Sequence, residues 1–178
     1  MAIYFLRHGE SEANVQNIFA GQKNNASLTT LGVEQARQIG FEIKKLNINR
    51  IIASNLTRAI QTATEVAGVV GFDSNQIEID ERIAEYDTGA LTNEPIRQIS
   101  SLDFIKVDGA EDVNLFHDRV VSFLKQYKNS DNNILMVSHA GVDRIIKASS
   151  RGIDLRTFYD IPGCPNTYLN KLDLDWLN

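Results

Sequence analysis

Three short runs of consecutive apolar residues divide the chain and predict strands that are buried on both faces of a sheet. The runs are Ile3–Leu6, Arg50–Ser54 (RIIAS) and Asn133–Ser138 (NILMVS). Continuous apolar runs of this length are typical of parallel strands covered by helices on both sides. Two weaker candidates are a short strand at Ile77–Ile79 and the alternating segment Tyr168–Leu174, which fits an edge or late strand.

Between these runs, apolar residues recur at the spacing of an amphipathic helix. The pattern predicts helices from Leu31 to about Leu46, Leu56 to about Val70, Glu111 to Tyr127 and Val142 to Arg151, with Thr30 as a possible cap of the first. Strands that alternate with helices predict an α/β fold, a three-layer α/β/α sandwich with a mainly parallel central sheet. Without repeats or linker-like segments, residues 1–178 are expected to form a single domain.

The composition is that of an ordinary globular protein, and it mainly serves to exclude some classes of partner and location. A net charge of −5 disfavours nucleic acid or an anionic membrane as a partner. No apolar run is long enough to span a bilayer, and no secretory signal precedes the first strand. Cys164 is the only cysteine, which rules out an internal disulfide and fits a reducing compartment. We therefore expect a cytoplasmic protein.

Polar side chains follow all three predicted inner strands. Arg7 and His8 end the first, Ser54 ends the second with Arg58 one helical turn later, and His139 follows the third. In a parallel sheet the carboxyl ends of the strands meet at one edge, which is where ligands bind. The sequence therefore predicts that two arginines and two histidines converge on one site.

Two arginines at one edge suit a phosphate, because the planar guanidinium is always charged and can donate two hydrogen bonds to a phosphoryl group. The two histidines add either hydrogen-bond donors or a nucleophile. Between cations the pKa of an imidazole falls, and the neutral ring keeps a lone pair that can attack phosphorus. Gly9 would let a backbone group approach His8 closely and hold its other ring nitrogen.

A phosphoryl transfer of this kind needs a proton for the leaving oxygen, and Glu85 is the candidate donor. Taken alone, the charged residues of ERIAEYDTG favour a solvated surface instead. Metal binding by His8, His139 and Glu85 is a weaker alternative, since neighbouring arginines repel a cation and no HxH or HExxH spacing occurs.

The motifs LRHGES, SNLTRAIQTA and SHAG, with Asn14 and Glu85 between them, resemble the histidine phosphatase superfamily, in its phosphoglycerate mutase-like group. They occur in the family's order and extend over most of the chain. The resemblance implies a phosphohistidine intermediate on His8 and no metal or organic cofactor. It also implies site residues at the matching positions: His8, Glu85 and His139 as catalytic residues, Arg7, Arg58 and Asn14 as phosphate ligands, and Gln22 as a substrate contact.

Within that group, the small phosphatase branch is the favoured interpretation. The stretch between Glu85 and His139 must hold a long helix and leaves little chain for a lid, so water is expected to reach the intermediate. The presence of Glu85 favours an ester, so the expected partner is a small phosphorylated metabolite. ALTN after Gly89, and Asn24 and Asn25 where an aspartate is typical, weaken any assignment of a particular substrate.

Two alternatives stay open: phosphoglycerate mutase activity that depends on a priming cofactor, and a non-catalytic protein that binds a phosphorylated ligand. Of the remaining residues, His117 is expected at the surface and Ser11 in a helix-terminal or phosphate contact. Cys164 is expected to be a small buried residue, and the pattern decides neither the place of Trp176 nor the oligomeric state.

Overall fold

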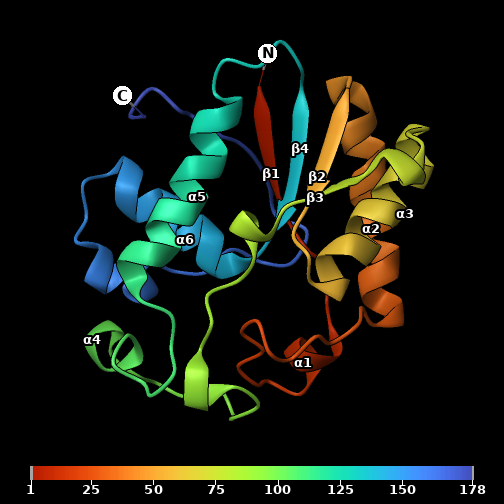
Figure 1. Ribbon diagram of the computed structural model, residues 1–178. Helices are drawn as coiled ribbons and strands as arrows, with labels where there is room; N and C mark the ends of the chain where they lie inside the picture. Colours follow the sequence, from red (N-terminus) through yellow and green to blue (C-terminus); the bar gives the residue numbers. More distant parts are fainter. Residues whose placement is uncertain (1, 178) are drawn as a thin grey trace.

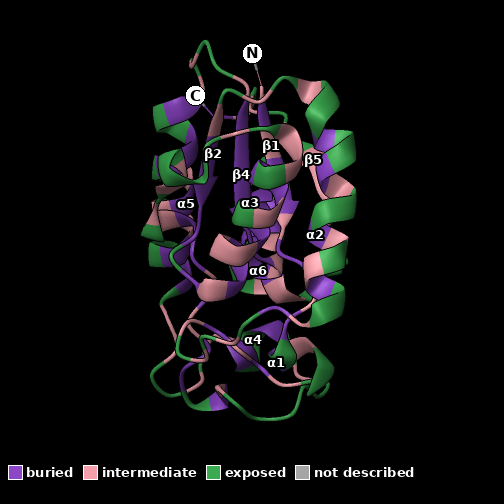
Figure 2. Cartoon of the chain, turned by 90° about the vertical axis from the view of Figure 1, so that its right-hand side faces the viewer, coloured by how far each residue is buried: buried purple, intermediate pink, exposed green. Residues whose placement is uncertain are grey.

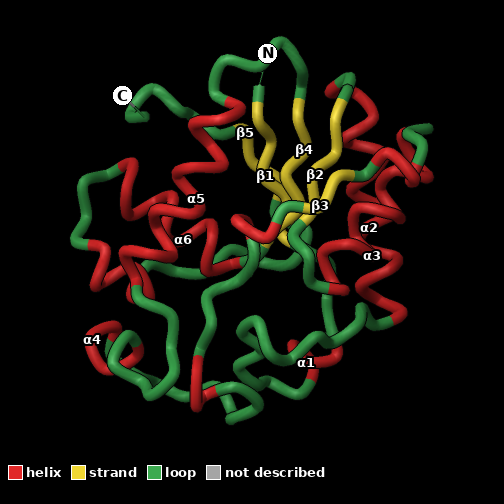
Figure 3. The backbone as a smooth tube through the Cα atoms, in the orientation of Figure 1, coloured by secondary structure: helices red, strands yellow, loops and turns green. Residues whose placement is uncertain are grey.

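A five-stranded sheet forms the centre of the computed structural model, which describes residues 2–177 (Figures 1 and 3). Its order is β3-β2-β4-β1-β5. β1 to β4 pair in parallel, whereas β5 runs antiparallel to β1 at one edge. The predicted mainly parallel sheet is confirmed. The strands are β1 (Ile3–Arg7), β2 (Arg50–Ala53), β3 (Glu78–Ile79), β4 (Ile134–Ser138) and β5 (Leu169–Lys171).

Helices cover both faces of this sheet: α2 and α3 lie on one side, α5 and α6 on the other (Figure 1). Successive side chains of a strand point to opposite faces, so Leu6 packs with the α2–α3 core and Phe5 with the α5–α6 core. β4 is buried along its whole length (Figure 2). These four helices are α2 (Thr30–Ile43), α3 (Thr57–Val70), α5 (Val113–Tyr127) and α6 (Ala140–Ser150). None of the helices described is long and apolar enough to cross a membrane.

The boundaries of the helices differ from the predicted ones where side chains cap them. Thr29, not Thr30, caps α2, because its hydroxyl accepts from the backbone of the first turn. Asp112 caps α5, so this helix starts after Glu111 instead of at it. α6 begins at Ala140, directly after β4. Five 3-10 turns complete the regular structure: Lys44–Leu46, Ser74–Gln76, Glu81–Ile83, Gly89–Leu91 and Leu155–Asp160.

Two short helices that the sequence pattern did not predict, α1 (Glu12–Val15) and α4 (Ser101–Phe104), lie beyond the carboxyl ends of the strands (Figure 1). α4 belongs to residues 88–110, which we call the cover segment. Its middle is bonded to the loop after α1, through Phe19 N to the Glu94 carbonyl at 2.9 Å and Ile96 N to the Asn17 carbonyl at 2.8 Å. The chain between Glu85 and His139 therefore does supply a segment beyond the carboxyl ends of the strands, although the sequence analysis expected little chain there for a lid.

Helices α2 and α3 pack closely at Gly40, where an added Cβ would lie 2.8 Å from the Cβ of Val69. Gly68, on the same helix pair, has no atom within 4 Å of an added Cβ. We expect Gly40→Ala to lower the free energy of unfolding by about 1–3 kcal/mol, because packed backbones must separate. Gly68→Ala is the matched control and should raise it by about 0.5–1 kcal/mol, because alanine restricts the unfolded chain. Urea unfolding of both variants tests this, and a stabilised Gly40→Ala protein would contradict the packing argument.

Candidate active site

A cavity of about 310 Å³ opens where β1 and β4 end, a volume that suits a small ligand. Arg7 and His8 enter it from the end of β1, Arg58 from the first turn of α3. Asn14 and Glu85 also line it, from α1 and from the loop after the Glu81–Ile83 turn. The predicted convergence of polar side chains at this edge of the sheet is therefore present.

His8 is 3% exposed and is fixed by its own neighbour. Its Nδ1 lies 2.7 Å from the Gly9 carbonyl, which can only accept, so Nδ1 carries the proton. Burial, followed by the charges of Arg58 and Arg7, lowers the pKa of His8 well below its usual value. The ring is therefore neutral near pH 7, with the lone pair on Nε2.

Gly9 has a second reason to be glycine. A Cβ at this position would collide with the carbonyl oxygen of Gly32 in the first turn of α2. The Gly9 N–H donates to Thr62 Oγ1 at 3.0 Å, and this hydroxyl in turn donates to the Arg58 carbonyl at 2.7 Å. The end of β1 is thus bonded to the helix that carries Arg58.

Backbone carbonyls hold both guanidinium groups. Arg58, 2% exposed, donates to the Asn24 carbonyl at 3.1 Å and the Gly21 carbonyl at 2.9 Å. Arg7 donates to the Cys164 carbonyl, and its Nε is buried without a partner among the described residues. Burial lowers the pKa of Arg58 to about 10 and also lowers that of Arg7, yet both stay charged at neutral pH. A buried donor without a partner at a cavity fits an anionic ligand.

His139 lies beside His8, with ring centroids 5.2 Å apart, but is not among the residues that line the cavity. Its Nε2 lies 2.7 Å from Ser54 Oγ, and its Nδ1 is buried without a partner in the described chain. Burial and then the charge of Arg58 lower the pKa of His139 well below its usual value. His139 therefore adds a second neutral imidazole behind the first.

Asn14 is oriented by its own helix terminus. Its Oδ1 accepts from Ser11 N and Ser11 Oγ, both at 3.1 Å, and from Asn166 Nδ2 at 3.2 Å. These bonds occupy the carbonyl side of the amide, so the NH₂ group is the side that can donate to a ligand. Ser11 therefore holds Asn14, in the helix-terminal role that the sequence allowed for it.

Glu85 approaches the first turn of α6. Its carboxylate accepts from Gly141 N at 3.2 Å and from Tyr86 N at 2.9 Å. A Cβ at residue 141 would collide with Oε1 of Glu85, so only glycine admits the carboxylate at this point. A carboxylate at a helix N-terminus is electrostatically favourable. Glu85 is thus a cavity residue rather than part of a solvated surface.

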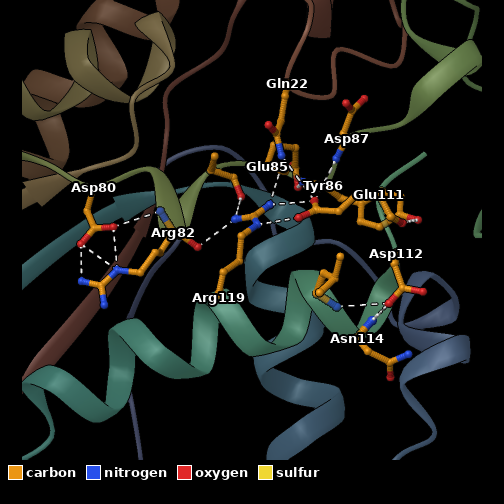
Figure 4. Close-up of polar contacts among 12 residues, drawn as sticks. Gln22, Asp80, Arg82, Glu85, Tyr86, Asp87, Glu111, Asp112, Asn114 and Arg119 are labelled. Atoms are coloured by element: carbon orange, nitrogen blue, oxygen red, sulfur yellow. Dashed lines mark hydrogen bonds and ion pairs between the residues drawn. The ribbon is translucent and has the colours of Figure 1, made fainter. Parts of the chain in front are cut away.

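Arg119 of α5 binds the backbone of the loop that carries Glu85 (Figure 4). The guanidinium donates to the carbonyls of Arg82 and Ala84, both at 2.8 Å, and of Glu85 at 2.9 Å. It also forms an ion pair with Glu111, at 2.7 Å. One side chain thus fixes three backbone carbonyls of residues 82–85 relative to α5.

Gln22 does not line the cavity and donates instead to Glu111 Oε2 at 3.3 Å (Figure 4). Its predicted contact with substrate has no counterpart in this arrangement and stays a prediction. The sequence analysis missed Arg144, which lies one helical turn after Gly141 and could have been found from that spacing. It also missed the apolar wall, which other segments supply through Ile18, Phe19, Ile96, Phe104, Phe158 and Tyr159.

Three further residues named in the sequence analysis are His117, Cys164 and Trp176, of which only Cys164 lines the cavity. His117 contacts Asp118 and Ser149 at the molecular surface. Cys164 is buried, and burial raises the pKa of its thiol to about 12, so it is not a thiolate at neutral pH. Trp176 donates to the Asp173 carbonyl and packs against the α5–α6 core. Among residues 2–177, no three His, Cys, Asp or Glu side chains gather as metal ligands would.

Comparisons with known proteins show the family and the fold of this chain. The model of the histidine phosphatase superfamily (branch 1) matches residues 3–176. "Putative phosphoserine phosphatase 2" of Hydrogenobacter thermophilus is 30% identical over 172 residues, which cover 89% of this chain and 83% of that protein. "Probable phosphoglycerate mutase GpmB" of Salmonella choleraesuis is 38% identical over 102 residues, only 57% of this chain and 44% of that protein.

Among solved structures, Bacillus stearothermophilus YhfR superposes with a TM-score of 0.81 at 23% identity. The match covers 98% of this chain and 91% of that one. At this level of identity the likeness shows the fold alone.

Because His8 and His139 are buried as neutral rings, we expect the free energy of unfolding to decrease at acid pH. Folding lowers the pKa of both histidines, so below about pH 6.5 the unfolded chain binds more protons than the folded one. The free energy of unfolding therefore decreases as the pH is lowered, by up to about 1.4 kcal/mol per pH unit for each histidine. We expect His139→Gln to reduce the slope of unfolding free energy against pH by about that amount. Urea unfolding between pH 7.5 and 5 measures it. His117→Gln, at the surface, is the control, and equal slopes in all three proteins would refute the assignment.

Proposed function

Because the chain belongs to the histidine phosphatase superfamily (branch 1), we propose that it hydrolyses a small phosphate monoester through a phosphohistidine on His8. The bond from His8 Nδ1 to the Gly9 carbonyl carries this proposal, since it leaves the Nε2 lone pair beside two guanidinium groups. The likeness to a relative named as a phosphoserine phosphatase, over most of both chains, supports hydrolysis.

In the first step, Nε2 of His8 attacks phosphorus and the ester P–O bond breaks. The bonding pair goes to the leaving oxygen, and that oxygen takes a proton from the carboxyl group of Glu85. Arg7 and Arg58 stabilise the negative charge on the equatorial oxygens. The NH₂ of Asn14 is a further donor at the same edge, and His139, whose Nδ1 has no partner among the described residues, supports the site from behind His8.

In the second step, a water molecule attacks the phosphohistidine. The Glu85 carboxylate takes a proton from that water, the P–N bond breaks, and its electron pair returns to His8. Phosphate leaves, and both His8 and Glu85 are back in their starting states. Side chains of the site donate and accept every proton in this cycle and stabilise the negative charge. The proposed mechanism therefore uses no metal and no organic cofactor.

The share of this chain that each relative matches favours hydrolysis over mutase action. The likeness to a probable phosphoglycerate mutase is limited to 57% of this chain, whereas that to the phosphoserine phosphatase extends over 89%. A mutase would return the phosphoryl group to the bound product before water arrives. A non-catalytic binding protein would need no proton donor, whereas a carboxyl group, that of Glu85, lines this cavity.

Hydrolysis of para-nitrophenyl phosphate in the presence of EDTA is the direct test. We expect His8→Ala to lower kcat by at least about 1000-fold, because the nucleophile is lost, and orthovanadate to inhibit the wild type. His117→Ala, the control, should retain activity. Turnover that vanishes in EDTA and returns with a divalent metal would contradict the mechanism, as would an active His8→Ala protein.

A second test isolates the proton donor. Glu85→Gln should slow an alkyl phosphate by about 100-fold or more, but para-nitrophenyl phosphate by less than about tenfold, because nitrophenolate leaves without a proton. Steady-state kinetics on both esters measure the ratio. Glu81→Gln, an exposed glutamate just before the same loop, is the matched control. Equal losses on the two esters would remove Glu85 from the acid role.

A further inference from the structure

Arg144 lines the same cavity as His8, yet no step of the proposed reaction uses it. Its Nε is buried and has no hydrogen-bond partner among the described residues. No carboxylate of residues 2–177 lies within ion-pairing distance of its guanidinium. Arg144 is half-buried, and a guanidinium without an ion-pair partner that keeps a buried free donor at a cavity favours an anionic ligand.

The position of this guanidinium is fixed by packing. Its central carbon lies 4.5 Å from the centroid of the Tyr159 ring, and Tyr159 stacks on Phe104 of the cover segment at 3.9 Å. On another side lies Gly163, where an added Cβ would come within 3.0 Å of Arg144 Nη2. Arg144 is therefore a preorganised group between Tyr159 and the loop of Gly163, with little freedom to lose on binding.

The positive charges that line the cavity, which also holds Glu85, fall into two groups. Arg7 and Arg58 flank His8 and suffice for the phosphoryl group. Arg144 is the one further lysine or arginine among the cavity residues of the described chain. A single guanidinium matches the charge and the planar shape of one carboxylate, whereas a second phosphate brings about two charges.

We propose that Arg144 binds a carboxylate of the substrate, so that the enzyme acts on phosphate esters of small carboxylic acids. This inference rests on the proposed function for its chemistry, but the site itself is a binding site that ligand affinity also reports. The phosphate lies at His8, and the carboxylate lies toward Tyr159 and the cover segment.

The test compares two esters that differ only in the carboxylate, O-phosphoserine and O-phosphoethanolamine. We expect the wild type to favour O-phosphoserine by about 10- to 100-fold in kcat/KM, the effect of a charge-assisted bidentate pair. Arg144→Met, which keeps length and contact with Tyr159, should bring this ratio close to one. Arg144→Lys should restore part of it, and Arg151→Met, exposed at the end of the same helix, should leave it at the wild-type value.

A wild-type ratio near one, a ratio unchanged in Arg144→Met, or a preference for ethylene glycol bisphosphate over O-phosphoserine would each overturn the carboxylate site. Hydrolysis of para-nitrophenyl phosphate, measured in parallel, shows separately whether the proposed function holds. If that hydrolysis fails, calorimetric titration of O-phosphoserine and O-phosphoethanolamine into the wild type and Arg144→Met still decides the site. Equal affinities for the two ligands would then refute it.

Discussion

Backbone carbonyls, rather than carboxylates, hold the two arginines beside His8, and the rest of the site depends on this choice. Arg58 donates to Gly21 and Asn24, and Arg7 to Cys164, so neither positive charge is neutralised. A paired aspartate would have cancelled a field that favours an anion and that, after burial, lowers the pKa of both histidines. The two unpaired charges thus suit a phosphate and also add to the burial that keeps His8 neutral, and placing such charges in the interior has an energetic cost.

Glycines at two close contacts let the chain build this arrangement. At Gly9 the end of β1 meets the backbone of α2, and at Gly141 the start of α6 admits the carboxylate of Glu85. Both glycines belong to motifs visible in the sequence, RHG and SHAG. Their function in each motif is explained by a contact with a distant segment, Gly32 in one case and Glu85 in the other. A local motif therefore records a tertiary constraint.

The sequence predicts those parts of the site that follow from strand ends and helix spacing, because parallel strands end at one edge. That argument brings together His8, Arg58 and His139 before any coordinates are known. It fails for groups that carry no side-chain signature. Any residue has a carbonyl, so nothing in the sequence marks Gly21 or Cys164 as the partner of an arginine. The cover segment was missed for a related reason, since its short pieces form through contacts with the loop after α1 rather than through local periodicity.

Helix α6 sets the order of groups along the cavity. Its N-cap is His139, its first turn bonds the carboxylate of Glu85 through Gly141, and Arg144 follows one turn later (about 5 Å along the axis). In the proposed complex these positions correspond to the phosphoryl group, the leaving oxygen and the acid group of the substrate. Arg119 then matters because it fixes the Glu85 loop from the side of α5, opposite the contact with α6. Contacts with two helices therefore fix both the backbone and the carboxylate of the proposed proton donor, one from each side of the loop.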